Sequence, residues 1–259
     1  MNIDEYAQQR LCDTRLFWLA KNYLARKGWF LSLSGEPQDA NGPIPWITYP
    51  AVSMLLRIIR PDFKVFEFGC GSSTVWWSKL VRAVIAVDYN QQWVEKVRTN
   101  ATERAVVIHR AMNCPTAYTT VLEEFFQKNY ELPTSGNVAH DIEHGLLCKE
   151  FAGYASEILT YPVGYFDLVV VDGMARILTA WLAARQLGPN GIVLFDNSER
   201  WQYNAAYQLL VDAGFVRLDF WGVGPVQRYE WCTSIFVRNP EILKQNPLIP
   251  CGQRADLGW

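Results

Sequence analysis

The sequence lacks the features of a membrane, secreted or nucleic-acid-binding protein. Its longest apolar runs, such as 168–171 and 191–195, fall far short of the ~18 residues that a membrane-spanning helix needs. Its first residues include Asp4 and Glu5 and lead into no apolar segment, so no signal peptide is recognisable. Lysine and arginine number 24 against 26 aspartates and glutamates, and this formal net charge of −2 offers no basic field for nucleic acid. We therefore expect a soluble, cytoplasmic protein with neither a nucleic-acid nor a membrane partner.

Paired cysteines are missing too. The six cysteines, at positions 12, 70, 114, 148, 232 and 251, are scattered without any Cys-x-x-Cys pair. Disulfide frameworks belong to small secreted chains and zinc sites need paired spacing, so reduced thiols are expected. His140 and His144 stand four residues apart, but no third and fourth ligand lie near them in sequence. This favours a loop or lid helix over a zinc site.

Apolar residues, by contrast, make up 50% of the 259 residues, enough for a sizeable core. From residue 64, short apolar runs alternate with segments of helical periodicity. Such alternation predicts a parallel sheet with helices on both faces. Two final runs leave no room for a helix between them and predict an antiparallel hairpin at one end of the sheet. The expected strands are 64–68, 83–87, 105–110, 166–171 and 191–195, and then the hairpin strands 216–221 and 233–237.

The remaining segments suggest a division of the chain. Residues 1–60 form an N-terminal helical cap, with a helix expected over 4–27 and a short one after Pro50. Residues 61–240 form the main α/β domain, and 241–259 a C-terminal tail. The segment 114–164 does not fit the alternation and is interpreted as an insertion near the strand ends. We expect the cap and the insertion together to roof the ligand pocket.

The first expected strand ends in a glycine-rich turn. In open α/β sheets the ligand binds at the carboxyl ends of the strands. Gly69 and Gly71 remove side chains where a ligand approaches closely, and Asp88 ends the second strand, where an acid suits the two hydroxyls of a ribose. The pair predicts a nucleoside site, although a tight turn with a strand-end acid remains the plainer alternative. A dinucleotide site needs a third glycine where Thr74 stands, which counts against a nicotinamide-dependent oxidoreductase.

Glu67, two residues before Gly69, is the acid that S-adenosylmethionine sites show at this place. The turn resembles motif I of class I S-adenosylmethionine-dependent methyltransferases, and the resemblance covers about 64–237. It implies a Rossmann-like, seven-stranded, mostly parallel sheet of order 3-2-1-4-5-7-6 and S-adenosylmethionine as cofactor. The further segments that resemble family motifs are 84–88 (ribose), 166–173 (fourth strand) and 187–194 (fifth strand). Those that resemble a bacterial-type, small-molecule subgroup are 46–50, 71–77, 172–176 and 196–200.

The resemblance also implies roles for individual residues. Asp88 would hold the ribose, Tyr89 would pack on the adenine, and Asn113 would meet the adenine amine unless it is an ordinary turn asparagine. Asp172 would lie beside the methyl donor. The cofactor pocket would be shaped by Glu67, Phe68, Gly69, Cys70 and Gly71, with Ser73 and Thr74 near the methionyl end. Cys70 is expected to fill a slot for a small residue rather than to act as a nucleophile.

Three oxygen-bearing side chains follow two adjacent strands: Asp172, Asp196 and Asn197. The trio resembles the metal site of catechol-type O-methyltransferases, in which Mg²⁺ binds the acceptor oxygen. Alternatively, Asp196 and Asn197 cap the next helix. We expect Asp172 and Asp196 to be catalytic.

The expected acceptor is a hydroxyl of a small molecule, with an amine as the nearest rival. A non-catalytic nucleoside-binding protein of the same fold is a further alternative, and a homo-oligomer is compatible with the sequence. Eleven tryptophans are present, of which Trp46, Trp76, Trp77, Trp201 and Trp221 stand near expected strand ends. Most are expected in the core and a minority in an acceptor pocket.

Overall fold

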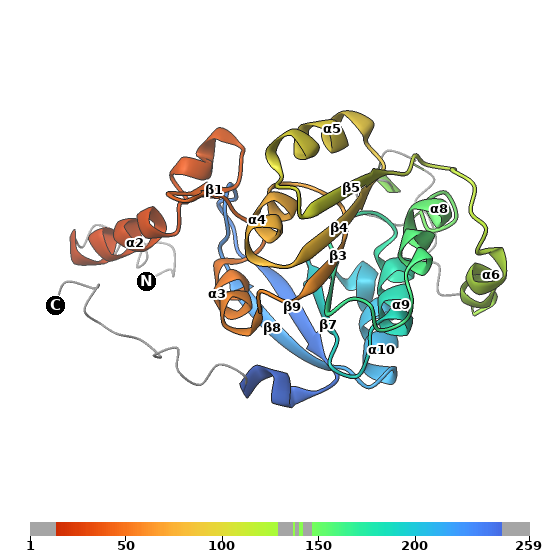
Figure 1. Ribbon diagram of the computed structural model, residues 1–259. Coiled ribbons are helices and arrows are strands. Elements are labelled where there is room, and N and C mark those ends of the chain that lie inside the picture. The colour runs from red at the N-terminus through yellow and green to blue at the C-terminus, as the bar shows by residue number, and fades with distance from the viewer. Residues whose placement is uncertain (1–13, 129–136, 138–139, 142–146, 245–259) are drawn as a thin grey trace.

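The computed structural model describes residues 14–128, 137, 140–141 and 147–244. Within these residues seven strands form one sheet of order β5-β4-β3-β6-β7-β9-β8 (Figure 1). In chain order this is 3-2-1-4-5-7-6, so the predicted topology is confirmed. The strands are β3 (Lys64–Phe68), β4 (Ala83–Asp88), β5 (Ala105–His109), β6 (Leu168–Val171), β7 (Ile192–Asp196), β8 (Val216–Gly222) and β9 (Trp231–Val237).

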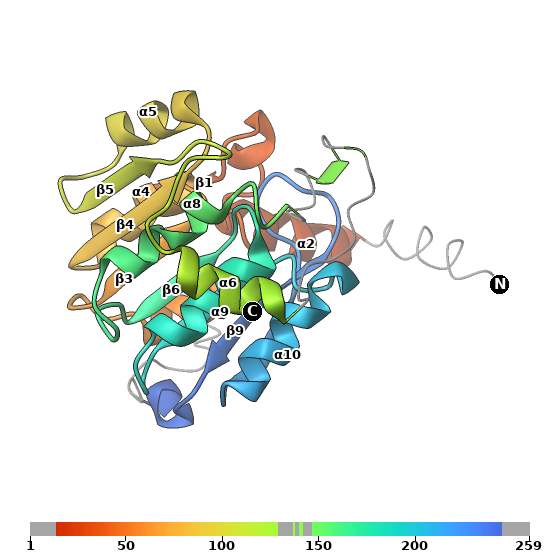
Figure 2. The same ribbon diagram turned by 90° about the vertical axis from the view of Figure 1, so that its right-hand side faces the viewer.

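Helices cover both faces of the sheet. α3, α4 and α5 lie on one face, and α6, α8, α9 and α10 lie on the other, which Figure 2 turns toward the viewer. The α-helices are α2 (Thr14–Arg26), α3 (Tyr49–Ile58), α4 (Ser72–Leu80), α5 (Gln91–Asn100), α6 (Thr119–Gln127), α8 (Ala152–Ala155), α9 (Arg176–Gln186) and α10 (Asn204–Asp212). The 3₁₀ helices are η1 (Leu31–Ser34), η2 (Ser156–Thr160), η3 (Trp201–Tyr203) and η4 (Pro240–Lys244).

The register of the sheet sets where the site lies. β3 pairs in parallel with β4 and β6, so Phe68 stands beside both Val87 and Val171. The carboxyl ends of these strands therefore meet at one edge. β6 is buried along its whole length, as expected of a strand covered on both faces. β7 also pairs with the antiparallel β9, which places Asp196 opposite Thr233.

The N-terminal segment is tied to the β8–β9 hairpin. Thr48 N–H donates to Thr233 Oγ1 (3.1 Å), and its hydroxyl donates to the Phe220 carbonyl (2.9 Å). Trp29 Nε1 donates to the Gln227 carbonyl (2.8 Å). Residues 38–43 add a small hairpin of β1 (Gln38–Asp39) and β2 (Gly42–Pro43). The segment between residues 29 and 49 is thereby held above the carboxyl edge of the sheet.

α2 differs from expectation in its packing. The predicted helix 4–27 is found over Thr14–Arg26, and residues 1–13 lie outside the described residues. Leu19 and Tyr23, two apolar residues of this helix, are 48% and 38% exposed. Figure 1 shows α2 at the periphery of the molecule. The periodicity therefore located the helix, but the described residues provide no cover for its apolar side.

The segment 114–164 contributes to the core as well as to the carboxyl edge. Leu122 and Phe125 of α6 pack in the same apolar cluster as Trp181 of α9, and Phe151, which precedes α8, and Tyr154 of α8 join that cluster. His144 lies outside the described residues. Across the described ranges, no helix is long and apolar enough to cross a membrane. The cysteines of the described ranges, at 70, 114, 148 and 232, are free thiols.

Candidate functional site

The glycine-rich turn is held by a buried acid beneath it. Glu67 is fully buried, and Thr74 Oγ1 donates to its Oε2 while accepting the Gly71 N–H at 3.0 Å. Burial raises the pKa of Glu67 to about 8. Its Oε1 has no hydrogen-bond partner among the described residues. The side chain of Thr74, which stands where a dinucleotide site has its third glycine, thus links the turn to Glu67 of β3.

Position 69 requires glycine for two reasons, its backbone conformation and the lack of room for a side chain. Its φ of +90° lies in the left-handed region, and a Cβ there would come within 3.0 Å of the Gly173 backbone. The ends of β3 and β6 therefore approach each other more closely than side chains would permit. This contact sets the turn directly beside Asp172.

Asp88 links the end of β4 to the same turn. Its Oδ2 accepts the Cys70 N–H (3.0 Å), and its Oδ1 accepts the Asn90 N–H (2.9 Å). Burial raises the pKa of this carboxyl. A carboxylate has about four lone-pair sites, so each oxygen retains one for a ligand. Trp93 Nε1 donates to the Cys70 carbonyl and closes the other side of the turn.

These elements enclose a first cavity of about 210 Å³, here called the turn cavity. Of the predicted cofactor residues, those that line it are Gly69, Cys70, Gly71, Ser73, Asp88, Tyr89 and Asp172. Glu67, Phe68 and Thr74 are wholly buried beneath it and do not line it. Asn113 lies apart, on an exposed turn with φ +60°, where its N–H donates to the Glu150 carbonyl. The remaining lining residues are Gly35, Glu36, Pro37, Trp46, Ser72, Trp93, Tyr154, Gly173 and Met174.

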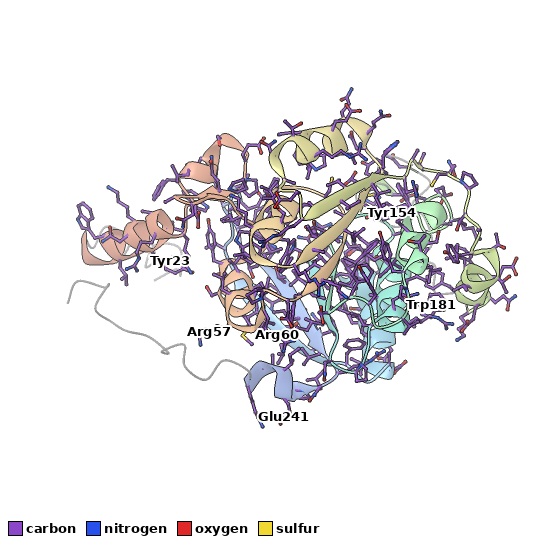
Figure 3. All side chains as sticks on the ribbon, in the orientation of Figure 1. Tyr23, Arg57, Arg60, Tyr154, Trp181 and Glu241 are labelled. Atoms are coloured by element: carbon purple, nitrogen blue, oxygen red, sulfur yellow. The ribbon has the colours of Figure 1, made fainter. Side chains whose placement is uncertain are left out.

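Tyr154 and Trp93 are wall residues that the sequence interpretation missed. Tyr154 belongs to α8, where Figure 3 labels it; it is 1% exposed, and its hydroxyl has no hydrogen-bond partner within the described residues. A Cβ at Gly173 would lie 2.1 Å from that hydroxyl, so Gly173 makes room for it. No sequence signal identified Tyr154, because its segment has no regular periodicity. Trp93 of α5 is 37% exposed and lines the cavity.

A second cavity of about 320 Å³, here called the polar cavity, adjoins the first. Asp172 and Trp46 line both cavities and separate them. The other lining residues are Asp196, Asn197, Arg200, Gln227, Tyr229 and Trp231. Of the tryptophans expected near strand ends, Trp46 lines this site, Trp76 and Trp77 are buried in the core, and Trp201 and Trp221 are exposed. The two cavities thus offer separate spaces that share Asp172 in their walls.

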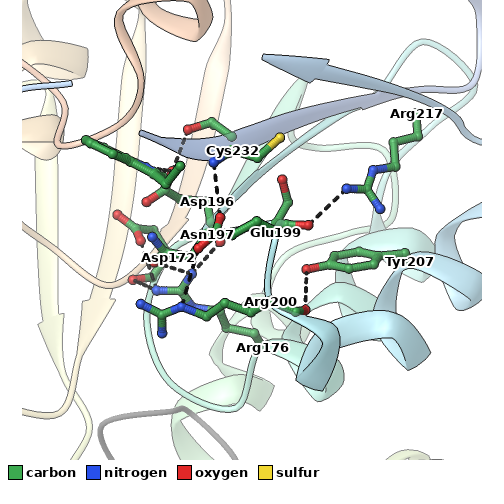
Figure 4. Close-up of polar contacts among 12 residues, drawn as sticks. Asp172, Arg176, Asp196, Asn197, Glu199, Arg200, Tyr207, Arg217 and Cys232 are labelled. Carbon is green, nitrogen blue, oxygen red and sulfur yellow. Dashed lines mark hydrogen bonds and ion pairs between the residues drawn. The ribbon is translucent and has the colours of Figure 1, made fainter. Parts of the chain in front are cut away.

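Asp172, Asp196 and Asn197 are brought together as predicted, but around the guanidinium of Arg176 (Figure 4). Arg176 donates to Asp172 Oδ1 (3.0 Å) and Asn197 Oδ1 (3.1 Å). It also donates to the backbone carbonyls of Asp172 (3.2 Å), Gly173 (3.1 Å) and Asp196. All five of its N–H donors thus have an acceptor. The side chain is 9% exposed, so this is a buried, fully paired cation.

The trio therefore does not fit a divalent metal. Two of the three side chains, Asp172 and Asn197, already accept hydrogen bonds from Arg176. The positive charge of Arg176 would also repel a metal cation. Across the described residues, no group of three or more histidine, cysteine, aspartate or glutamate side chains is arranged to hold a metal ion. The sequence predicted the oxygen ligands but not the arginine among them. The expectation of Mg²⁺ at Asp172, Asp196 and Asn197 is not supported.

Asp196 has one engaged and one available oxygen. Its Oδ1 accepts from Trp231 Nε1 (3.0 Å) and from the Thr233 hydroxyl, while Oδ2 has no hydrogen bond to the described residues. Burial and the nearby charge of Asp172 raise the pKa of Asp196 to about 7. The capping alternative is not found, because η3 and α10 begin without a side-chain cap. Asn197 and Ala175 adopt left-handed φ values of +54° and +51°, which is the local backbone strain often found at functional sites.

Comparisons with known proteins give the following result. No protein-family model matches the sequence, and no curated protein matches it. Among solved structures, the chain is similar to a precorrin 8W decarboxylase from Methanobacterium thermoautotrophicum, with 15% identity, 79% of this chain and 97% of that chain covered, and a TM-score of 0.45. It is also similar to a precorrin-6y C5,15-methyltransferase from Geobacter metallireducens, with 13% identity, 73% and 87% coverage, and a TM-score of 0.47. A methyltransferase-like protein from Silicibacter pomeroyi shows 19% identity, 76% and 91% coverage, and a TM-score of 0.41. These likenesses are too distant to say what this chain does.

Proposed function

We propose that this chain is a class I S-adenosylmethionine-dependent methyltransferase that acts on a hydroxyl group of a small molecule. The observation that carries the proposal is the pair of adjoining cavities that share Asp172 at the carboxyl edge of a 3-2-1-4-5-7-6 sheet. One cavity has the glycine turn and strand-end acid of a nucleoside site. The other has carboxylates suited to an acceptor.

The turn cavity offers the groups that S-adenosylmethionine requires. Asp88 has lone pairs left for the ribose hydroxyls, and Tyr89 and Trp93 supply flat apolar surfaces for the adenine. The unpartnered hydroxyl of Tyr154 supplies a buried hydrogen-bonding group in the same wall. When bound, the cofactor supplies a methyl group activated by a sulfonium: the carbon–sulfur bond breaks with its electron pair on sulfur as the carbon–oxygen bond forms, which leaves neutral S-adenosylhomocysteine.

The protein's own task is to align the acceptor and to take its proton. Asp196 Oδ2 is available and its pKa of about 7 suits a general base at neutral pH. Asp172 is held by Arg176 at the junction of the two cavities, where it can orient the acceptor hydroxyl. Trp46 lines both cavities at their junction, where its ring helps to keep water out. A metal ion has no part in this proposal.

The test is calorimetric titration of the purified full chain with S-adenosylhomocysteine, with NAD⁺ in parallel. The product should bind in the micromolar range and NAD⁺ should not. Asp88→Asn should weaken binding at least tenfold, whereas Asp62→Asn, an exposed aspartate paired with Arg60, should leave it unchanged. Absence of product binding to the wild type, or a preference for NAD⁺, would refute the proposal. Thermal melts of both variants exclude unfolding as the cause.

A further inference from the structure

Arg200 is a second arginine at the polar cavity, and its hydrogen bonds are unsatisfied. Its Nε stands 3.7 Å from Glu199 Oε1, too far for a hydrogen bond, and no nitrogen of its guanidinium donates to a described residue. Its backbone is nonetheless fixed, because its carbonyl accepts the Tyr207 hydroxyl (3.3 Å). Figure 4 shows its side chain extending toward Asp172 and Asn197. The terminal nitrogens of Arg200 are therefore available to a ligand in the cavity.

The charges around the polar cavity favour an anion beside Arg200. Asp172 is paired closely with Arg176 (3.0 Å), whereas Arg200 has only longer-range partners, an ion pair with Glu199 at 3.7 Å and the charge of Asp172. Glu199 does not line the cavity, and its Oε2 already accepts the Cys232 N–H (3.1 Å). Asp196 is buried with one oxygen committed to Trp231 and Thr233. A planar guanidinium with open donors is the side chain best matched to a carboxylate, which it binds through two parallel hydrogen bonds.

The walls of the cavity favour a small, flat molecule. The exposed lining of the cavity is mainly polar, but Trp46, Tyr229 and Trp231 are among the residues that form it, and the last two meet edge to face with centroids 6.0 Å apart. The volume of about 320 Å³ lies at the low end of the range for ligand pockets. A small volume and a mainly polar lining, with three aromatic residues in the wall, suit a single ring that carries polar substituents.

We propose that the polar cavity is the acceptor site and that its ligand is a small aromatic hydroxy acid. Its carboxylate binds the open guanidinium of Arg200, and its hydroxyl faces Asp172 and Asp196 at the junction with the turn cavity. The assignment of this ligand as methyl acceptor rests on the proposed function. The anion site itself rests on Arg200 and the walls of the cavity. Arg200 is thus a specificity-determining residue, and Arg176 is not.

Three ring compounds that differ in one substituent test this proposal: 4-hydroxybenzoate, phenol and 4-hydroxybenzylamine. Binding of each to the full chain is measured by calorimetry, with and without saturating S-adenosylhomocysteine. The variants are Arg200→Gln and Arg200→Lys, and the matched control is Arg82→Gln, an exposed arginine just before β4, at the opposite edge of the sheet. S-adenosylhomocysteine affinity is measured for every variant.

We expect the wild type to bind 4-hydroxybenzoate in preference to the other two probes. Arg200→Gln should weaken this binding roughly tenfold to a hundredfold, the size of a lost charge-assisted hydrogen-bond pair. Arg200→Lys should recover part of the loss, and Arg82→Gln should change nothing. Phenol and S-adenosylhomocysteine should bind the variants as they bind the wild type.

Other outcomes would overturn the proposal. If the acid binds no better than phenol, or the amine binds best, the cavity does not select an anion. If Arg200→Gln weakens S-adenosylhomocysteine instead, Arg200 binds the cofactor's carboxylate, and the methyltransferase proposal stands without this one. If the acid binds through Arg200 but S-adenosylhomocysteine does not bind at all, the anion site survives and the proposed function fails.

Discussion

Replacing Arg176 by methionine tests whether a buried cation holds the two strand ends together. Methionine keeps much of the length and the apolar stem of arginine but removes the charge and all five N–H donors. The carboxylate of Asp172 and the oxygens on Gly173, Asp196 and Asn197 lose a donor at once. Because the side chain is only 9% exposed, water cannot readily replace these bonds.

The expected loss of stability is large. Removing one partner of a buried ion pair costs about 3–5 kcal/mol, because the remaining charge is left uncompensated. The nearby charge of Arg200, which also stabilises ionised Asp172, places the expected value toward the lower end. For a chain of this size such a loss lowers the melting temperature by roughly 6–15 °C.

Urea denaturation followed by circular dichroism gives the free energies of unfolding. Arg185→Met on the same helix is the matched control, because Arg185 is 44% exposed and pairs with Glu124 at the surface. Its cost should stay below about 1 kcal/mol. The double variant Arg176→Met/Asp172→Asn should recover part of the loss, since no buried charge is then left unpaired. If Arg176→Met costs no more than Arg185→Met, the buried ion pair does not hold the site.

Three further predictions concern the cofactor wall, the buried acids and metal ions. Tyr154→Phe should weaken the binding of S-adenosylhomocysteine roughly twofold to tenfold, because one hydrogen bond is lost, without lowering the melting temperature of the ligand-free protein. The control Tyr165→Phe should leave binding unchanged. A drop in stability with intact binding would mean that the hydroxyl of Tyr154 is structural. The pKa values of Glu67 and Asp196 are raised in the folded state, to about 8 and about 7, so these groups stabilise the fold fully at acidic pH, and that contribution is lost as the pH rises from about 4 through 8. Urea melts from pH 5 to 8 should therefore show falling stability, with a shallower slope in Glu67→Gln, and a rising profile would contradict the assignment. Finally, a chelator and added Mg²⁺ should leave S-adenosylhomocysteine binding and methyl transfer unchanged, and a loss of turnover on chelation would restore the metal hypothesis.

The strands and the glycine turn were predictable because their signals are local. Three of the five residues of β3 are apolar and the strand leads directly into the glycines of the turn, and the structure has β3 at Lys64–Phe68 as predicted. The order of the strands followed from the alternation and the final hairpin together with the family resemblance. The apolar stripe of α2 located a helix but did not reveal whether anything covers it, because periodicity carries no information about the partner.

The residues that the sequence interpretation missed are those placed by distant contacts. Tyr154 reaches the turn cavity because α8 packs beneath Gly173, which no local pattern announces. Arg176 had a weak signal, since an aspartate four residues earlier is the spacing of a helical ion pair. Its burial, however, depends on Asn197 and the Asp196 carbonyl from the neighbouring strand end. Counting oxygen ligands without the arginine between them led to the metal expectation.

The two arginines near Asp172 show why hydrogen-bond saturation, rather than charge, separates a structural residue from a binding one. Arg176 has an acceptor for each of its donors, so a ligand could recruit it only by breaking bonds that hold β6 and β7 in place. Arg200 carries the same charge a short distance away, yet its donors reach no described residue and its side chain borders a cavity. A ligand that binds Arg200 therefore gains its hydrogen bonds without disturbing the sheet. The same reasoning distinguishes Asp196 Oδ1, held by Trp231 and Thr233, from Oδ2, which has no hydrogen bond to a described residue and is the oxygen that takes the proton in the proposed reaction.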